Sequence, residues 1–228
     1  MLMLVFALRE EARAVRRRIR WQPRTQVTAG ETGSVDAGRR GFFAGHEVSL
    51  SFVGIGGAGI DQVEREVELV KPQLIISSGF AGATRSLLQP GDFVLSANYT
   101  DRAMGKLLIR QKIVDASGAF VQVKEVASVA DKWSLNRTAG SAAVDMESEI
   151  IADLCRRKQI SLVTARMISD AIDETIPGIF VGRKVASLRD LSDAAVFAAR
   201  MLGLTERLAD RLEALVGTLG NGLLSRRD

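Results

Sequence analysis

The sequence has very little of the two side chains that most often build cross-links and metal sites. One cysteine, Cys155, excludes a disulfide bond within the chain, and one histidine, His46, excludes a histidine-rich metal site. A single histidine also argues against a nucleophile activated by histidine. We therefore expect neither a metal nor an organic cofactor, and we look for chemistry among the 27 acidic and 31 basic side chains.

Long apolar runs are also missing. No run approaches the ~18 residues that a membrane span needs, and the apolar residues 1–8 lack the basic segment that opens a signal peptide. The single cysteine fits a reducing compartment, so we expect a cytoplasmic protein. A chain of 228 residues without a linker or an internal repeat predicts one domain over residues 1–228.

The net charge is +4, with arginines clustered at residues 16–18 and 226–227. Basic surfaces attract nucleic acids or anionic membranes. Aromatic side chains, which stack on bases in such sites, do not interleave with these arginines. We expect a solvated helix face and no nucleic-acid partner.

Apolar runs alternate with amphipathic segments along the chain. We expect strands at residues 2–8, 25–35, 39–44, 47–53, 74–78, 91–96, 120–126, 142–146 and 162–168. We expect helices at 10–20, 58–70, 131–138, 147–158, 183–202 and 205–219, whereas 100–118 show no clear pattern. This alternation predicts an α/β protein of three α/β/α layers with a mostly parallel, mixed central sheet.

Glycines and carboxylates gather after the expected strands, where ligands bind in such sheets. Glu11, Glu147 and Asp170 each follow a strand, with Glu10 as the alternative to Glu11. Carboxylates without metal-binding histidines suit acid–base chemistry on a neutral or cationic substrate, and glycosidic bond cleavage is such a reaction. Helix capping and favourable charge at a helix N-terminus explain the same acids structurally, so both interpretations stay open.

The glycines at 54, 56 and 59 follow a strand and open a helix, as in a dinucleotide-binding turn. That turn also needs an acid at the end of the next strand to hold the ribose. The next strand here ends in Ser77 and Ser78 before Gly79, with no acid. A turn that lets a small ligand approach the backbone is the favoured interpretation.

Several of these segments together resemble a known family. They are residues 6–11, the turn 53–56, residues 78–82 leading to 90–92, residues 143–148, and residues 166–170. In this order they resemble the methylthioadenosine/adenosylhomocysteine nucleosidases and purine nucleoside phosphorylases, over about residues 4–173. Residues 145–148 and 173–177 also resemble a bacterial branch of hopanoid-associated nucleoside phosphorylases, which are thought to act on an adenine nucleoside with a large lipid 5′ group.

The resemblance implies a role for each matched residue. Glu147 would bind the ribose hydroxyls, with Met146 packed on the sugar. Asp170 would protonate the purine at N7 with help from Ser169, and Glu11 would activate the attacking water. The substrate-binding set is completed by residues at two strand ends, Gly56, Gly79 and Phe80.

The sequence departs from the family pattern in two ways. Phe80 stands where many relatives carry a small or hydroxyl residue, and the strand end lacks the arginine with which hexameric phosphorylases bind phosphate. Arg9 or Arg39 would have to replace it. Hydrolysis of a purine nucleoside, of the 5′-substituted adenosine type, is therefore our expectation, with phosphorolysis and a non-catalytic nucleoside- or dinucleotide-binding module as alternatives.

Two expectations concern partners. The resemblance implies a homodimer, because a partner subunit closes the 5′ end of the pocket in the nucleosidases. A leucine stripe near the basic C-terminus suits either core packing or a membrane surface, and core packing is favoured. The stripe consists of Leu208, Leu212, Leu215 and Leu219.

Overall fold

The computed structural model describes residues 1–23, 39–181 and 188–224. Its strands are β1 Leu2–Phe6, β2 Arg20–Trp21, β3 Arg40–Phe43, β4 His46–Phe52, β5 Leu74–Ser77, β6 Phe80–Ala83, β7 Phe93–Ser96, β8 Ala116–Gly118, β9 Phe120–Gln122, β10 Ala143–Asp145 and β11 Ser161–Asp170. Its helices are α1 Arg13–Arg18, α2 Ile60–Val70, α3 Arg102–Arg110, α4 Val129–Ala139, α5 Ser148–Lys158 and α6 Leu188–Leu224, with 3-10 turns η1 Ile55–Gly57 and η2 Gly178–Val181. The strand expected at 25–35 lies wholly outside the described residues, and so do the first residues of the helix expected at 183–202.

Within these residues, all strands belong to one mixed sheet. Strands β4, β1, β5 and β11 run parallel, and β2 and β3 extend the β4 edge in antiparallel pairing. The last residues of β11 pair in parallel with β6, while its middle pairs antiparallel with β7. The ten-residue strand β11 therefore joins both parts of the sheet. The mostly parallel, mixed sheet expected from the sequence is confirmed.

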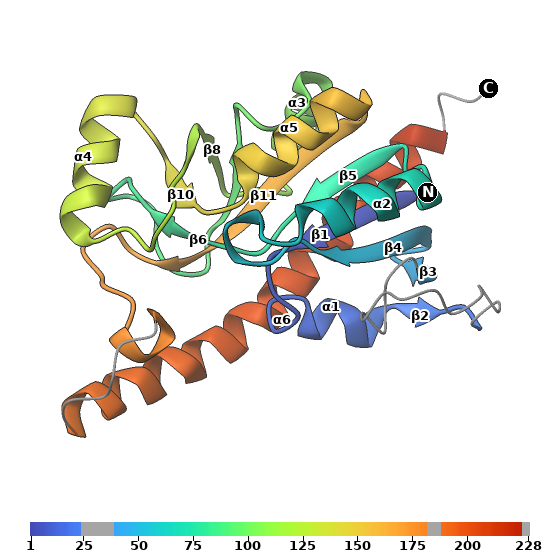
Figure 1. Ribbon diagram of the computed structural model, residues 1–228. Helices are drawn as coiled ribbons and strands as arrows, with labels where there is room; N and C mark the ends of the chain where they lie inside the picture. The colour runs from blue at the N-terminus through green and yellow to red at the C-terminus, as the bar shows by residue number, and fades with distance from the viewer. Residues whose placement is uncertain (24–38, 182–187, 225–228) are drawn as a thin grey trace.

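Helices cover both faces of this sheet (Figure 1). Helices α1 and α6 lie below it in the view, and α2 and α5 lie above it. Burial on both faces explains why the central strands are almost wholly apolar instead of alternating. The three-layer α/β/α arrangement is confirmed.

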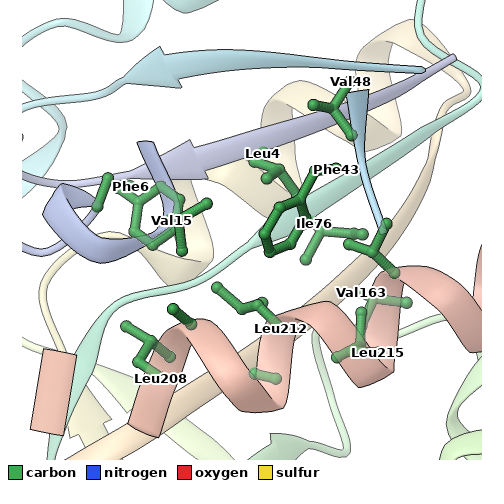
Figure 2. Packing of buried hydrophobic residues seen from close by; sticks show 14 of the residues in the cluster. Leu4, Phe6, Val15, Phe43, Val48, Ile76, Val163, Leu208, Leu212 and Leu215 are labelled. Carbon is green, nitrogen blue, oxygen red and sulfur yellow. The ribbon is translucent and has the colours of Figure 1, made fainter. Parts of the chain in front are cut away.

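The larger core cluster lies between the sheet and α6. Figure 2 shows Leu208, Leu212 and Leu215 on the side of α6 that faces the sheet, in one cluster with Leu4 of β1 and Ile76 of β5. All three α6 leucines are fully buried. The stripe is thus core packing, which leaves these leucines no role at a membrane surface. In the part of the chain that the structure describes, no helix is long and apolar enough to cross a membrane.

The observed elements differ from the expected ones in three places: one expectation is wrong, and two regions had no prediction. The C-terminal region is one helix, α6, and not the two expected helices. A glycine inside a helix, here Gly203, costs only about 1 kcal/mol. Burial of Leu204 and Leu208, which follow it, offsets that cost. Residues 100–118, which showed no pattern, hold α3 and β8. Strand β6 was not expected, because a four-residue strand containing two alanines and a glycine carries almost no apolar pattern.

Local capping explains where α3 and α4 begin. The Asp101 carboxylate accepts hydrogen bonds from the backbone N–H groups of Ala103 and Met104. Ser128 and Asp131 form a reciprocal capping box, so α4 starts two residues before the expected helix. The placement of α4 matters for the site below, because it sets which of its side chains point toward β11.

The basic cluster at residues 16–18 packs beside α6 and not on an isolated face. Arg17 forms an ion pair with Glu206, and Arg18 lies 2.6 Å from Asp210 and 3.3 Å from Glu213. These pairs are partly solvent-exposed, so each contributes little to stability. They show that Arg17 and Arg18 face acidic side chains of α6.

We predict that Leu212→Ala lowers the free energy of unfolding by about 2–5 kcal/mol, because it opens a cavity between α6 and the sheet. Leu202→Ala on the same helix is the matched control, since Leu202 is 59% exposed. Urea denaturation measures both. A loss for Leu212→Ala no larger than that of the control would contradict the packing in Figure 2.

Candidate active site

Glu11 lies in the turn between β1 and α1, and its side chain folds back onto the sheet. Its Oε2 accepts hydrogen bonds from the backbone N–H groups of Ala7, at 3.1 Å, and Leu8, at 3.2 Å. The carboxylate lies so close to Gly79 that a Cβ atom there would be 2.9 Å from Oε2. Glu11 therefore bridges the end of β1 and the β5–β6 junction, whereas Glu10 is exposed.

Burial changes the acidity of Glu11. Loss of hydration raises the pKa of its carboxyl to about 7, although the backbone N–H of Leu8 and the charge of Arg166 lower it. The nearby Glu147 raises it further, and the backbone N–H of Phe80 lowers it. A carboxyl with a pKa near 7 can take up a proton at neutral pH, as a general base requires.

Glu147 connects β10 to α5 and is buried. Its Oε1 accepts a hydrogen bond of 2.9 Å from the backbone N–H of Gly56, in the glycine turn after β4. Burial raises the pKa of the Glu147 carboxyl, while Arg166 and the Gly56 N–H lower it. Met146, its neighbour in the chain, is half-buried.

The glycine turn thus has a structural explanation. Gly56 has a φ of +62° and donates its N–H to Glu147, and a Cβ on Gly57 would be 2.6 Å from the Ile150 side chain of α5. The turn brings β4 and α5 together and orients a carboxylate. It gives no support to the dinucleotide alternative.

Arg166 lies in the middle of β11 and is only 2% exposed. Its Nε is 3.1 Å from Oδ2 of Asp145, and its Nη2 donates to Oγ of Ser77 at 3.0 Å and of Ser148 at 3.4 Å. Its Nη1 is buried and has no hydrogen-bond partner. A buried donor without a partner is uncommon, and it marks a place where a ligand atom can complete the site.

Asp170 is the last residue of β11 and is 1% exposed. Its Oδ1 accepts a hydrogen bond from Oγ of Ser169, and its Oδ2 pairs with Nζ of Lys132 on α4. Gly82 of β6 packs against the pair, since a Cβ there would lie 3.0 Å from Asp170 Oδ2. Both oxygens of the expected acid are therefore engaged by protein groups.

These residues can be compared with known proteins. The family model of the phosphorylase superfamily matches residues 2–127, more than half of the chain. The chain belongs to the phosphorylase superfamily. With the family, the expected class of enzyme is confirmed, a glycosidic bond hydrolase or a pentosyltransferase.

Similar curated proteins of the superfamily are nucleosidases by name. The chain is 27% identical over 202 residues to the 5′-methylthioadenosine/S-adenosylhomocysteine nucleosidase of Bacillus cereus strain B4264, covering 73% of this chain and 84% of the relative. It is 28% identical over 165 residues to the nucleosidase of the same name from Buchnera aphidicola subsp. Acyrthosiphon pisum strain Tuc7, covering 58% and 71%.

Solved structures share the fold at low sequence identity. A putative nucleosidase of the same name from Borrelia burgdorferi B31, bound to adenine, superposes with a TM-score of 0.73 at 16% identity, over 95% of this chain and 99% of that one. Futalosine hydrolase from Helicobacter pylori strain 26695 gives a TM-score of 0.70 at 16% identity, over 94% and 96%. The nucleoside phosphorylase/hydrolase-like fold is confirmed.

The superfamily fold brings the expected residues to one edge of the sheet, but in two groups. Glu11 and Glu147 both lie within the electrostatic reach of Arg166, and Gly56, Gly79 and Phe80 supply the backbone around them. Ser169 and Asp170 form the second group with Lys132. Phe80 also packs partly onto the core beside α6.

Sequence reasoning missed two cations of this superfamily site. Arg166 was quoted only within a motif, although an arginine inside a buried strand needs partners and is itself a signal. Lys132 gave no signal, because a lysine in the short helix expected at residues 131–138 is ordinarily exposed to solvent. Of the arginines proposed instead, Arg39 stacks on Trp21 at 4.8 Å. Arg9 stacks on Phe52 at 4.9 Å and, with Phe52, lines a groove beside Leu8 and Gly54.

Among residues 1–23, 39–181 and 188–224, no group of three or more histidine, cysteine, aspartate and glutamate side chains could hold a metal ion.

We predict that Gly79→Ala displaces the Glu11 carboxylate, because the added methyl group would lie 2.9 Å from Oε2. The pKa of Glu11, followed by carboxyl carbon NMR, should shift from its value of about 7. Gly45→Ala is the control, since Gly45 also has a positive φ, of +80°, but has nothing within 4 Å of its Cβ position. An unchanged pKa in Gly79→Ala would show that the two groups are not in contact.

Proposed function

We propose that this chain hydrolyses the N-glycosidic bond of a purine nucleoside, with Glu11 as the base that activates water. One observation carries the proposal. A carboxyl with a pKa of about 7 lies at the strand ends, within the electrostatic reach of both Arg166 and Glu147. A base that ionises near neutral pH, beside a cation with a free donor, is what activation of a water molecule requires. The names of the similar nucleosidases and of futalosine hydrolase support this choice of reaction.

The nucleophile would lie between Glu11 and Arg166. Nη1 of Arg166 donates to the water oxygen, and the Glu11 carboxylate accepts a proton from the water as its oxygen attacks the anomeric carbon. Asp145 and Ser77 hold the guanidinium in place through Nε and Nη2, at 3.1 Å and 3.0 Å. Because the guanidinium is fixed before substrate binds, little reorganisation is needed during the reaction.

Glu147 would hold the sugar. With Oε1 fixed by Gly56, the carboxylate can accept hydrogen bonds from the ribose hydroxyls, a charge-assisted contact of about 1.5–3 kcal/mol. The half-buried Met146 would pack on the ribose. Negative charge near the ring also stabilises the oxocarbenium-like transition state.

Asp170 and Ser169 would bind the purine. The electron pair of the breaking C1′–N9 bond stays on the base, which takes up a proton at N7. Asp170 lies at the end of β11 and pairs with Gly82 of β6. The leaving group would then lie beside Gly82 and the nucleophile beside Gly79, which directly precedes β6.

A 5′-substituted adenosine is the proposed substrate type. Leu8, which adjoins the backbone groups that hold Glu11, is 37% exposed, and Ile55, which precedes Gly56, is 56% exposed. A groove of about 540 Å³ runs beside Leu8, lined by Ala7, Phe52 and Gly54 and also by the polar residues Arg9, Glu10 and Gln62. Exposed apolar side chains of this size suit an apolar 5′ group. The homodimer expected from the sequence stays a prediction.

Phosphorolysis is the second candidate, and a specific observation favours it. The sequence argument against phosphate rested on a missing arginine, but the structure brings Arg166 to Ser77 from another strand. A buried guanidinium with a free N–H group suits a phosphate oxygen as well as water. Glu11 favours water, because its carboxylate repels a dianion when ionised.

We predict that kcat/KM for a purine nucleoside falls about tenfold per pH unit below pH 7 and levels off above it. The sign follows from the role: the base works only when deprotonated, and burial has raised its pKa to about 7. Glu11→Gln should lose roughly 10²–10⁴-fold in rate. The exposed neighbour Glu10→Gln is the control and should keep the wild-type profile. Full activity at pH 5 would remove Glu11 from the role of base.

The choice of nucleophile is tested by a phosphate titration of the initial rate on an adenosine derivative. We predict a rate independent of phosphate, with free ribose or its 5′-substituted form as product. A rate that rises from near zero and saturates, with the sugar 1-phosphate as product, would establish phosphorolysis. Arg166→Met should lower the rate of both hydrolysis and phosphorolysis. Its effect therefore tests whether Arg166 belongs to the site, but it does not distinguish water from phosphate as the nucleophile.

A further inference from the structure

Lys132 is a lysine in an unusual position. It lies on α4 and is 2% exposed, and its ammonium group donates to three acceptors. These are Oδ2 of Asp170, the carbonyl oxygen of Ala171 at 2.8 Å and the carbonyl oxygen of Glu174 at 2.8 Å. An ammonium carries three protons, so each is used. Such a buried charge persists only when it is fully paired.

The surroundings keep this lysine on Asp170. Gly82 of β6 leaves room for the contact, since a Cβ there would be 3.2 Å from Cε of Lys132. Glu174, whose carbonyl oxygen also accepts from Lys132, does not compete through its side chain, because its carboxylate is held by Arg200 of α6 at 2.9 Å and by the backbone N–H of Ala171 at 3.0 Å. The Arg200 ion pair and that N–H outweigh burial and lower the pKa of Glu174. Asp170 is therefore the carboxylate that Lys132 contacts.

This contact matters for the leaving group. With Oδ1 accepting from Ser169 and Oδ2 paired with Lys132, both oxygens of Asp170 act as acceptors, and neither is placed to hold a proton of its own. A carboxylate without a proton cannot act as an acid. The ammonium is a proton donor in direct contact with it, and the departing purine anion is a base of strength comparable to an amine.

We propose that Lys132 is a positioning residue that supplies, through Asp170, the proton taken up by the leaving purine; this rests on the proposed function. As the C1′–N9 bond breaks, its electron pair goes to the purine. The Nζ–H bond of Lys132 breaks, its proton passes to Oδ2 of Asp170, and Asp170 delivers a proton to N7. Lys132 is left as an amine and Asp170 as a carboxylate. Glu11, which took the water proton, releases it to solvent, and Lys132 regains one from solvent after the products leave.

The test separates leaving-group activation from structural support. Wild type and Lys132→Met are assayed on a purine nucleoside and on 4-nitrophenyl β-D-ribofuranoside, whose leaving group departs without a proton. For Lys132→Met we expect a loss of roughly 10²–10⁴-fold on the purine nucleoside and a change of about threefold or less on the nitrophenyl riboside. Arg137→Met, which removes an exposed cation from the same helix, should change neither rate.

A second variant covers the case in which Lys132→Met fails to fold because it leaves Asp170 unpaired. Lys132→Met combined with Asp170→Asn removes both charges together. If Lys132 acts through Asp170, the double variant loses no more purine activity than Asp170→Asn alone.

Each result has one meaning. Equal losses on both substrates, no loss on either, or additive losses in the double variant would overturn the role of Lys132. A wild-type protein that cleaves neither substrate would overturn the proposed function itself, and this inference with it. Wild-type cleavage of both substrates with a loss confined to the purine nucleoside supports both.

Discussion

The site depends on a buried guanidinium. Arg166 is placed in the middle of β11, where both neighbouring strand ends and the start of α5 can reach it, and it contacts Asp145, Ser77 and Ser148. Removing an arginine from water is costly unless its donors find acceptors. The acceptors come from β5, β10 and α5, so satisfying one side chain fixes the ends of three elements. The same charge lowers the pKa of both Glu11 and Glu147, which lets two carboxylates share one small space.

A second cation serves the other end of the site. Arg166 accompanies the carboxylates proposed for the nucleophile and the sugar, and Lys132 accompanies the carboxylate proposed for the base. The two cations differ in a way that suits their places. A guanidinium keeps its proton and orients partners in a plane, whereas an ammonium can give a proton away. In the proposed mechanism, the Arg166 guanidinium lies where the water oxygen bonds to the anomeric carbon. The Lys132 ammonium lies where the C1′–N9 bond breaks.

The balance between water and phosphate rests on the protonation of Glu11. At an effective dielectric constant near 20, unit charges 4 Å apart interact by roughly 4 kcal/mol, so repulsion by an ionised Glu11 and attraction by Arg166 are of similar size. Burial holds the pKa of Glu11 at about 7, so this carboxylate gains or loses its charge within the physiological range. Its ionised form both activates water and disfavours a dianion, which links the choice of nucleophile to the pH dependence.

The sequence by itself determined the layers of this protein and most of one sheet edge. Continuous apolar runs such as residues 2–6 and 74–77 favour strands buried on both faces. Strands β1 and β11 run parallel to β5, which brings their carboxyl ends, with Glu11 and Asp170, to the same side. Tertiary structure alone decided the contacts of these acids and brought Glu147 to them, because the preceding strand β10 runs antiparallel to β6 and the Gly56 N–H holds the Glu147 carboxylate. Glu11 and not Glu10 takes part, because its carboxylate reaches Gly79. Lys132 contacts Asp170 across 38 residues of chain, a contact that the helix expected at residues 131–138 did not indicate. Desolvation and charge pairing depend on three-dimensional neighbours, and neither spacing nor composition records them.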